Sequence, residues 1–462
     1  MFSLADTILE EKVDTVRNIL EHDIDVNNID EYGFTPLIEA AIINNIEISK
    51  LLIQRGANPN QPDMLGNTAL HWAAENNNPE MASLFLKNHA DPNAHNISGQ
   101  PVLAMPLLRQ QQHLKKLLLR HGADLTFAQD YINTKFLGHL FELVGTATII
   151  DPQNQFVEVD FEGFFLEISL AMIADSLEQF KNHFAGRQLR RYIHEFQMVI
   201  DVIFRASHLI KYQQYKVNIQ KHQSDILPLI QEEPLIIPIG YEGHAITFIK
   251  FGNILVKCDR REESRLYDNI MIYQMNNPSI LSTQFIQKLM YEKQSDDFIN
   301  HHLPDLLQLQ PITELKMHAQ ISGNCSWANV EACIPALFFL LFSRNEDFSA
   351  NIKRYKNLSL KLFNEWREWN KERALRFCIQ NFKQADSIRK ACKAEILTAI
   401  LYQCCGGVSP LDSERAELIL NAIAIPEYEP ILKNYIQVYC YEDYSEEGKR
   451  FLQLLREWGY KV

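Results

Sequence analysis

A repeat of 33 residues is the feature that most constrains how the first part of this chain can fold. Two series of positions keep this spacing: Gly33, Gly66 and Gly99, and Gly56, His89 and Gly122. Self-similarity at a fixed period of this length indicates a stack of small units, because one unit cannot bury its own apolar face. The spacing therefore predicts an elongated array in which each unit packs on its neighbours.

The residues between these positions are repeated as well. Residues 33–41, GFTPLIEAA, align with residues 66–74, GNTALHWAA, and residues 99–103 are a degraded third copy. Residues 23–27, DIDVN, mark the end of an earlier copy, which makes four in all. A 33-residue period with a T-P-L-H-x-A signature resembles the ankyrin repeat. The resemblance implies an all-α solenoid over residues 1–130 that binds another protein.

Predicted turns separate the repeats. Asp30, Asp63 and Asn96 each precede a glycine by three positions, which is typical of a type I turn. The tips of such turns project from a stack, so we expect them to contact a partner protein. The residues expected in this interface are Asp30, Glu31, Tyr32, Asp63, Met64 and Leu65. The alternative is that the array is a passive spacer.

Composition narrows the classes of partner. The chain has 462 residues, which suggests about two to four domains. Its 45 Lys and Arg residues against 58 Asp and Glu residues give a net charge of −13. A phosphate-binding surface over the whole chain is therefore excluded, and no direct contact with nucleic acid is expected. We expect the protein to be a monomer.

The cysteines and the apolar runs exclude further classes. None of the eight cysteines forms a C-x-x-C pair, and eight are too few for a disulfide scaffold, so we expect no metal or other cofactor. The first residues lack a basic segment followed by an apolar one, so no secretory signal peptide is expected. The longest apolar run, residues 332–342, has 11 residues, whereas a membrane-spanning helix needs about 20.

After Thr126 the repeat ends and the pattern changes. A short strand is predicted at residues 156–159, with helices around residues 164–182 and 187–210. Short β-rich runs then follow at close spacing, which indicates an antiparallel sheet. These runs cover residues 235–239, 245–250, 254–258 and 269–273. The central region over residues 131–345 is therefore predicted to be an α+β domain with an antiparallel sheet.

Two of these runs are joined by a turn at residues 252–253, Gly-Asn, which predicts a β-hairpin. His244 begins one strand and Asp259 ends the other. Because the outer ends of a hairpin lie side by side, we expect these two side chains to be neighbours. A lone histidine before a strand is more often structural, so the pair alone does not indicate a function.

A cysteine is predicted at the start of a long helix. Gly323 breaks the chain and Asn324 is a good N-cap, which places Cys325 in the first helical turn. Free backbone N–H groups and the helix dipole lower the pKa of a thiol at that position, and a nearby imidazole would lower it further. The alternative is a core cysteine at the start of a buried helix.

These residues resemble the papain-like cysteine proteases. Residues 325–328, CSWA, with Gln320 five positions before the cysteine, are similar to the nucleophile segment of that family. His244 resembles its histidine, and Asp259 resembles the Asn or Asp of the adjoining strand. Papain runs Cys, His, Asn, whereas this chain runs His, Asp, Cys, so the resemblance implies a circularly permuted fold. A triad is recognised by geometry and not by chain order.

The resemblance implies a Cys-His-Asp site for hydrolysis or acyl transfer. Cys325 would attack a carbonyl carbon, His244 would give its proton to the leaving group, and Asp259 would fix the imidazole tautomer. The Cys325 N–H and the Gln320 amide would hold the oxyanion. The alternative is a protease-like domain that is inert.

The C-terminal region over residues 346–462 has helical apolar spacing and few strand signals, so it is predicted to be helical. An acidic cluster near its end consists of Glu442, Asp443, Glu446 and Glu447. This cluster resembles the Glu-rich signal of bacterial effectors exported by type IV secretion. The alternative is a solvated helix end.

The combination of an ankyrin array with a cysteine protease-like domain resembles the ankyrin-repeat effectors of Legionella. Residues 130–135, DYINTK, directly after the array, belong to this resemblance. It implies secretion into a host cell by type IV secretion, a location in the host cytosol or nucleus, and a host protein as the partner of the array. Two classes of function stay open: a thiol hydrolase or acyl transferase, and a non-catalytic binding scaffold.

Overall fold

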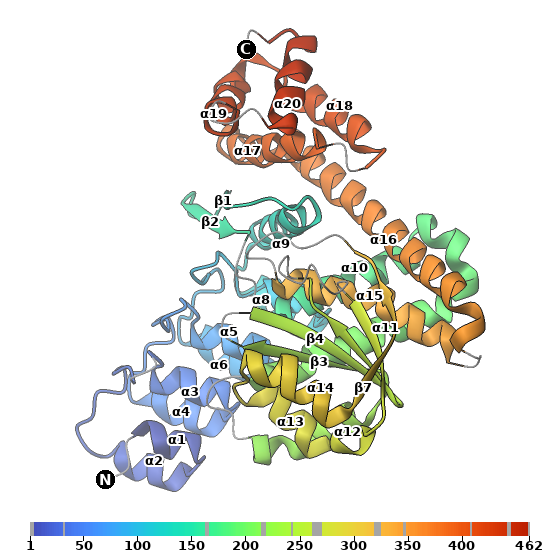
Figure 1. Ribbon diagram of the computed structural model, residues 1–462. Helices are drawn as coiled ribbons and strands as arrows, with labels where there is room; N and C mark the ends of the chain where they lie inside the picture. The colour runs from blue at the N-terminus through green and yellow to red at the C-terminus, as the bar shows by residue number, and fades with distance from the viewer. Residues whose placement is uncertain are drawn as a thin grey trace.

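The computed structural model describes residues 4–30, 33–161, 166–213, 219–241, 244–260, 270–317, 325–344, 348–406, 409–440 and 445–460. Over these residues the chain is mostly helical and has one sheet of two strands and one of five, both antiparallel. A helical array, a central region with the larger sheet and a helical C-terminal region follow one another along the chain (Figure 1). This confirms the predicted multidomain α+β architecture.

The array consists of antiparallel helix pairs at the predicted period. Their bounds are α1 (Leu4–Leu9), α2 (Val13–Ile19), α3 (Pro36–Ile42), α4 (Ile46–Gln54), α5 (Ala69–Glu75), α6 (Pro79–Lys87), α7 (Ala104–Leu108) and α8 (Gln112–Arg120). Thr35 caps α3, because its hydroxyl accepts a hydrogen bond from the Ile38 N–H at 3.1 Å. Pro36 then occupies the first helical position, where no N–H is needed.

A left-handed residue ends the second helix of each of three consecutive pairs. Gly56, His89 and Gly122 have φ angles of 87°, 68° and 95°. Glycine adopts this conformation without steric cost, whereas a residue with a Cβ atom is strained there. His89 therefore adopts the same left-handed conformation as the two glycines, and its Cβ atom makes this conformation strained.

One asparagine in each repeat links it to the next. Asn27 donates to the Gly56 carbonyl at 3.2 Å and accepts from the Asn58 N–H at 2.7 Å. Asn60 and Asn93 make the same two bonds to the following loops. Because both polar ends of each amide are satisfied by backbone of the next repeat, these bonds fix the distance between repeats.

The helix α9 (Leu125–Leu140) belongs to both the array and the central region. Ala128 packs in the apolar core of the array, whereas Phe136 and Leu140 pack in the core of the central region. The hairpin of β1 (Thr146–Ile150) and β2 (Phe156–Asp160) lies against the turn of the last repeat. A Cβ atom at Gly99 in that turn would lie 2.7 Å from the Glu158 carbonyl oxygen, so only glycine allows this approach.

The central region surrounds a sheet with the strand order β3-β4-β5-β6-β7. The strands are β3 (Leu235–Tyr241), β4 (His244–Phe251), β5 (Ile254–Cys258), β6 (Ile270–Met275) and β7 (Leu309–Leu315). Its helices are α10 (Leu166–Asn182), η1 (Phe184–Tyr192), α11 (Ile193–Ile210), η2 (Lys211–Gln213), η3 (Ile219–His222), α12 (Gln223–Gln231), η4 (Pro278–Ile280), α13 (Thr283–Tyr291), η5 (Phe298–His302), α14 (Leu303–Leu307) and α15 (Cys325–Ser343).

Helices cover both faces of this sheet. Ile237, Ile246 and Phe248 point to the face covered by α12, α13 and α14. Ile249 and Val256 point to the opposite face, where they share a core with α15 and α10. Alternate residues of one strand are therefore buried on opposite faces, which explains why the β-rich runs of the sequence are almost continuously apolar.

The four predicted strands of the sheet are present, and the fifth strand was not predicted. β7 contains Pro311 and three polar residues in its seven, LQPITEL, so it lacks the β-branched run typical of a central strand. It lies at the edge of the sheet, where a proline is tolerated because one side of the strand needs no N–H donor.

The C-terminal region is helical, as predicted. It contains α16 (Phe348–Gln384), α17 (Ser387–Cys404), α18 (Asp412–Ile423), η6 (Pro426–Tyr428), α19 (Glu429–Tyr439) and α20 (Glu446–Glu457). The long helix α16 runs from the central region to the helices α17 to α20 (Figure 1). Of the acidic cluster, Glu446 and Glu447 lie in the first turn of α20, and Glu442 and Asp443 lie outside the described residues.

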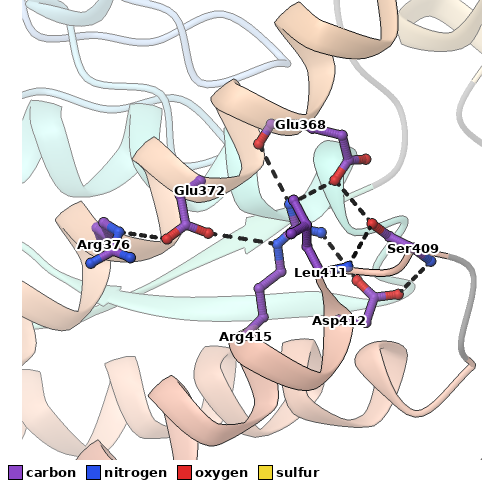
Figure 2. A network of polar contacts seen from close by, with 7 residues as sticks. All are labelled: Glu368, Glu372, Arg376, Ser409, Leu411, Asp412 and Arg415. Atoms are coloured by element: carbon purple, nitrogen blue, oxygen red, sulfur yellow. Dashed lines mark hydrogen bonds and ion pairs between the residues drawn. The ribbon is translucent and has the colours of Figure 1, made fainter. Parts of the chain in front are cut away.

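A buried arginine joins α18 to α16. Figure 2 shows Arg415, which is 1% exposed, between Glu368 and Glu372 of α16 and Asp412 of its own helix. The Arg415 guanidinium lies 2.7 Å from Glu368 and 3.1 Å from Asp412. Because three carboxylates surround this one cation, its burial is compensated and the two helices are held together.

The helix α15 is long and apolar enough to cross a membrane, judged by length and composition alone. It is also 89% buried within the protein, between the sheet and α16. The central helix of a globular core has both properties, so α15 is a core helix of this domain.

Prediction for the array. Replacing Leu70 with Ala should lower the free energy of unfolding of the array by ~2–5 kcal/mol, because Leu70 is fully buried in α5 and the change leaves a cavity. Equilibrium denaturation followed by circular dichroism measures this loss. Leu65→Ala, the same change at a side chain that is 43% exposed, is the matched control and should cost far less. Equal costs for the two variants would contradict the assigned core.

Candidate functional site

The helix α15 begins at Cys325. The side chain of Cys325 is half-buried, whereas the other seven cysteines are buried. The first turn of an α-helix has free backbone N–H groups and the positive end of the helix dipole, which favour a thiolate over a thiol. Cys325 therefore combines solvent access with a position that promotes ionisation.

The β4–β5 hairpin brings His244 and Asp259 together. β4 begins at His244, and Asp259 directly follows β5. The strand register pairs Thr247 with Cys258, so Asp259 lies beside the first residues of β4. The His244 Nε2 atom is 3.1 Å from the Asp259 Oδ1 atom, and the two side chains are only 13% and 10% exposed.

The imidazole of His244 also contacts the thiol. Burial raises the pKa of the Cys325 thiol, but hydrogen bonds with His244 and with the Ala245 backbone, together with the charge of the imidazole, lower this pKa below its ordinary value. Because Nε2 faces Asp259, we infer that Nδ1 is the ring nitrogen that meets the thiol. The three side chains therefore form a hydrogen-bonded series in the order Cys, His, Asp.

Six of the other seven cysteines differ from Cys325 in the direction in which the pKa of the thiol is shifted. Burial raises the pKa of Cys258, Cys378, Cys392, Cys404, Cys405 and Cys440. The pKa of Cys378 rises to about 12, and that of Cys392 to about 11. Since the thiolate is the nucleophilic form, thiol reactivity is expected at Cys325 rather than at these positions.

Asn329 holds the helix against the hairpin. It lies one turn after Cys325 and is 1% exposed. Its amide donates to the Ala245 carbonyl at 2.6 Å and accepts from the Arg260 N–H at 2.8 Å. Ala245 follows His244 and Arg260 follows Asp259, so one side chain positions both strand ends relative to the cysteine.

A buried chain of charges lies behind this contact. The Arg260 guanidinium is 3.0 Å from Glu331. Glu331 lies two residues after Asn329 in α15 and is 2% exposed. Glu331 also pairs with Arg367 of α16 at 3.3 Å, and Arg367 pairs with Glu142 at 2.8 Å. Alternating signs compensate the cost of burying Arg260 and Glu331, and the series reaches the half-exposed Glu142 at its end. The end of β5 is thus connected to α15, α16 and the segment after α9.

Aromatic rings also pack the start of α15 on α9. The Trp327 ring stacks on the His139 ring with centroids 4.2 Å apart and an angle of 3° between the planes. Phe136 of α9 meets the same tryptophan edge to face at 5.8 Å. The first turn of α15 is therefore packed directly on the helix that continues from the array.

Two further groups lie beside the imidazole and its carboxylate. The Lys257 Nζ atom lies 3.4 Å from the second oxygen of Asp259 and donates to Asn300 at 2.6 Å. The Tyr241 ring meets the His244 ring edge to face at 5.6 Å. Sequence reasoning missed these residues and Asn329. Lys257 precedes Asp259 by two strand positions and Asn329 follows Cys325 by four helical positions, so periodicity alone could have indicated both.

Gln320, predicted to hold the oxyanion, lies outside the described residues, which resume at Cys325. Its role stays a prediction. The Cys325 N–H is in the first helical turn, where it has no intrahelical acceptor.

Comparisons with known proteins identify the family. A model of the ankyrin repeat matches residues 65–97, and a model of three ankyrin copies matches residues 7–63. A solved structure of the Legionella effector AnkH is 38% identical in sequence and covers 100% of this chain and 98% of its own, with a TM-score of 0.90. The chain belongs to the AnkH family. No curated protein matches it.

The similarity to AnkH extends over all three regions of the chain. The ankyrin models stop at residue 97, whereas the structural match continues through the central sheet and the C-terminal helices. The sheet, α15 and the long helix α16 are therefore part of the AnkH fold and not an addition to it.

The predicted interface of the array is only partly exposed. The Asp63 carboxylate is buried and accepts hydrogen bonds from the Leu65 and Asn67 N–H groups at 2.9 and 2.8 Å. Asp30 likewise accepts from the Phe34 N–H at 2.8 Å. These two aspartates shape the turns instead of projecting from them.

Two apolar side chains at the turn tips are accessible. Met64 is 71% exposed and Leu65 is 43% exposed. Glu31 and Tyr32, the other predicted contact residues, lie outside the described residues. In the described parts of the chain, no three His, Cys, Asp or Glu side chains are grouped in a way that could hold a metal ion.

Prediction for the thiol. Iodoacetamide at about pH 6 should label Cys325 ahead of the other cysteines, because only the thiolate reacts and the pKa of Cys325 is lowered. His244→Ala should slow this labelling by about tenfold or more, since each unit of pKa changes the thiolate fraction tenfold. Peptide mass spectrometry at several times measures each rate. Cys378, buried with a raised pKa, is the internal control.

Labelling of Cys325 at the same rate as Cys378, or at a rate unchanged by His244→Ala, would show that the imidazole does not activate the thiol. The labelling rate of Cys325 should also fall less steeply than that of an ordinary thiol as the pH falls from about 8 to about 6, because the pKa of Cys325 is lowered.

Proposed function

We propose that this AnkH family member is an effector that binds a host protein through its ankyrin array and acts on it by thiol hydrolysis or acyl transfer. The observation that carries the proposal is the hydrogen-bonded series from Cys325 through His244 to Asp259. Ankyrin arrays bind proteins, and the similarity to a Legionella effector supports delivery into a host cell by type IV secretion. The host cytosol or nucleus is the proposed location.

The first step is attack by the Cys325 thiolate on a carbonyl carbon of the substrate. The thiol proton is held on His244 Nδ1, which makes the imidazole positive. As the C–S bond forms, the electron pair of the C=O bond moves to the oxygen. The helix dipole and the free N–H groups at the start of α15 stabilise this negative charge.

The second step releases the leaving group. His244 gives its Nδ1 proton to the leaving nitrogen or oxygen as the bond to the carbonyl carbon breaks, which leaves a thioester on Cys325. Asp259 holds Nε2 throughout, so the ring keeps the orientation that Nδ1 needs. Lys257 beside Asp259 favours the ionised carboxylate, which in turn stabilises the imidazolium.

The thioester is then consumed by a second nucleophile. Neutral His244 takes a proton from water or from an acceptor amine, whose oxygen or nitrogen attacks the thioester carbonyl. The C–S bond breaks, the thiolate is restored, and the acyl group leaves as an acid or as a new amide. Which nucleophile enters decides between hydrolysis and acyl transfer.

Prediction for catalysis. p-Nitrophenyl acetate should acetylate Cys325 with release of one p-nitrophenolate, followed by slower turnover as water cleaves the thioester. His244→Ala should reduce the acylation rate by ~10²–10⁴-fold, because the thiolate and the proton donor are both lost. Absorbance follows the phenolate and mass spectrometry locates the acetyl group.

The controls separate catalysis from general reactivity. Cys325→Ala should abolish the covalent adduct and keep the thermal melting temperature, since a small side chain replaces a half-buried one. Cys392→Ala should leave the rate unchanged, because Cys392 lies outside the site and its pKa is raised. Acetylation of Cys325 no faster than that of other thiols would favour a non-catalytic binding scaffold.

Prediction for the array. Met64→Asp combined with Leu65→Asp should reduce capture of a host protein by the full-length chain, because both side chains are exposed at a turn tip and charge disrupts an apolar contact. Capture from a host-cell lysate with identification by mass spectrometry measures the change. Val438→Asp places a charge at another exposed apolar residue and is the control. Equal capture by both variants would exclude this turn from the interface.

A further inference from the structure

A cavity lies where the array meets the central region. Its volume is about 300 Å³, and its walls come from the array and from the central helices α10 and α11 with η2. Trp72 and Glu75 of α5 form the array side, and Glu167 of α10 and Gln213 of η2 form the opposite side. None of the residues around Cys325 lines it.

The charged residues that line this cavity are all acidic. Asp63, Glu75 and Glu167 place three carboxyl groups in its wall, and its lining residues include no lysine or arginine. The one histidine of the wall, His71, is buried and its pKa is lowered to about 4, so it carries no positive charge near neutral pH. The charged groups among the described lining residues are therefore acidic.

The three carboxyl groups differ in their partners: Asp63 accepts hydrogen bonds from its own turn, Glu75 has a counter-ion, and Glu167 has no ion-pair partner among the described residues. Glu75 pairs with Arg109 at 2.6 Å, and Arg109 also donates to the Ser207 carbonyl of α11, so this cation is committed to the wall. Glu167 makes no salt bridge and no side-chain hydrogen bond with any other described residue. Burial and the neighbouring Glu75 raise the pKa of Glu167 to about 7, which Arg109 only partly offsets. An unpaired, poorly solvated carboxyl group is costly unless a ligand completes it.

A second polar group of the wall is also incomplete. Trp72 is 9% exposed, and its indole Nε1–H has no acceptor within hydrogen-bond distance among the described residues, although it interacts with the Asp63 carboxylate from farther away. A buried indole N–H normally finds an acceptor, because leaving it unpaired costs free energy. The cavity therefore calls for a ligand with a positive group and a hydrogen-bond acceptor, next to the aromatic rings of Trp72 and Phe34.

We propose that this cavity receives an arginine side chain of the partner protein, with its guanidinium at Glu167 and a peptide carbonyl at the Trp72 N–H. The inference rests on the proposed protein-binding role of the array and does not depend on the chemistry at Cys325. A guanidinium is planar, donates two parallel hydrogen bonds to a carboxylate and packs against aromatic rings, so it suits this wall better than an ammonium group.

The test uses a minimal probe on the full-length protein. N-acetyl-arginine amide should bind at one site with a dissociation constant on the order of 1 mM, as expected for a ligand of this size. N-acetyl-citrulline amide has nearly the same shape without the charge, and it should bind about tenfold or more weakly. Ligand-observed NMR titrations measure both.

Three variants locate the site. Glu167→Gln keeps the shape of the side chain and should weaken arginine binding by about tenfold or more. Trp72→Phe keeps an aromatic ring, removes the N–H and should weaken it to a smaller extent. Glu80→Gln, at an exposed glutamate of α6 that pairs with Lys50 outside this cavity, is the matched control and should change nothing. Circular dichroism and melting temperature establish that each variant is folded.

The outcomes are separable. Equal affinities for arginine and citrulline, or no loss in a folded Glu167→Gln variant, would overturn the proposal. Cys325→Ala should bind the probe as the natural chain does, so a failure of the thiol chemistry leaves this test intact. If Glu167→Gln loses binding of the probe but captures the host partner normally, the partner does not use this cavity. The protein-binding function of the array would then still stand.

Discussion

The amide of Asn329 is the interaction on which the geometry of the thiol site depends. It reaches from the second turn of α15 to the carbonyl after His244 and to the N–H after Asp259. A carboxamide donates through its nitrogen and accepts through its oxygen, so this one side chain makes both bonds at the same time. Because the amide is buried, water does not compete for either bond, and the helix start is held against two strand ends at once.

Asparagine amides also hold elements together in the array, but there the bonds are spread over several separate junctions. Asn27, Asn60 and Asn93 each make two bonds to the next loop, so the loss of one affects a single junction. Repeats contribute additively to the stability of a stack, whereas a network at one site fails as a unit. The array should therefore tolerate sequence change along its length better than the surroundings of Cys325 do.

Local sequence patterns predicted those elements whose partners are near in the chain. The period of the array, four strands of the sheet, the hairpin that pairs His244 with Asp259 and the helix after residue 324 could all be predicted. The stacking of Trp327 on His139 and the pairing of Arg260 with Glu331 could not, because nothing in a local pattern specifies contacts between distant elements. β7 was missed because an edge strand with proline and polar residues lacks the usual periodicity. The predicted roles of Cys325 and Gln320 remain to be tested by chemistry.

The shared helix α9 has a consequence for how a captured protein would be presented. Its first turns are embedded in the repeats and its last turns carry His139, which lies on the tryptophan two residues after Cys325. Over the described residues α9 is one continuous helix from Leu125 to Leu140, so it sets the distance between the array and the thiol. A substrate held on the array would be read at a set distance from its docking point, and selection among its bonds would follow from reach more than from the residues beside the bond.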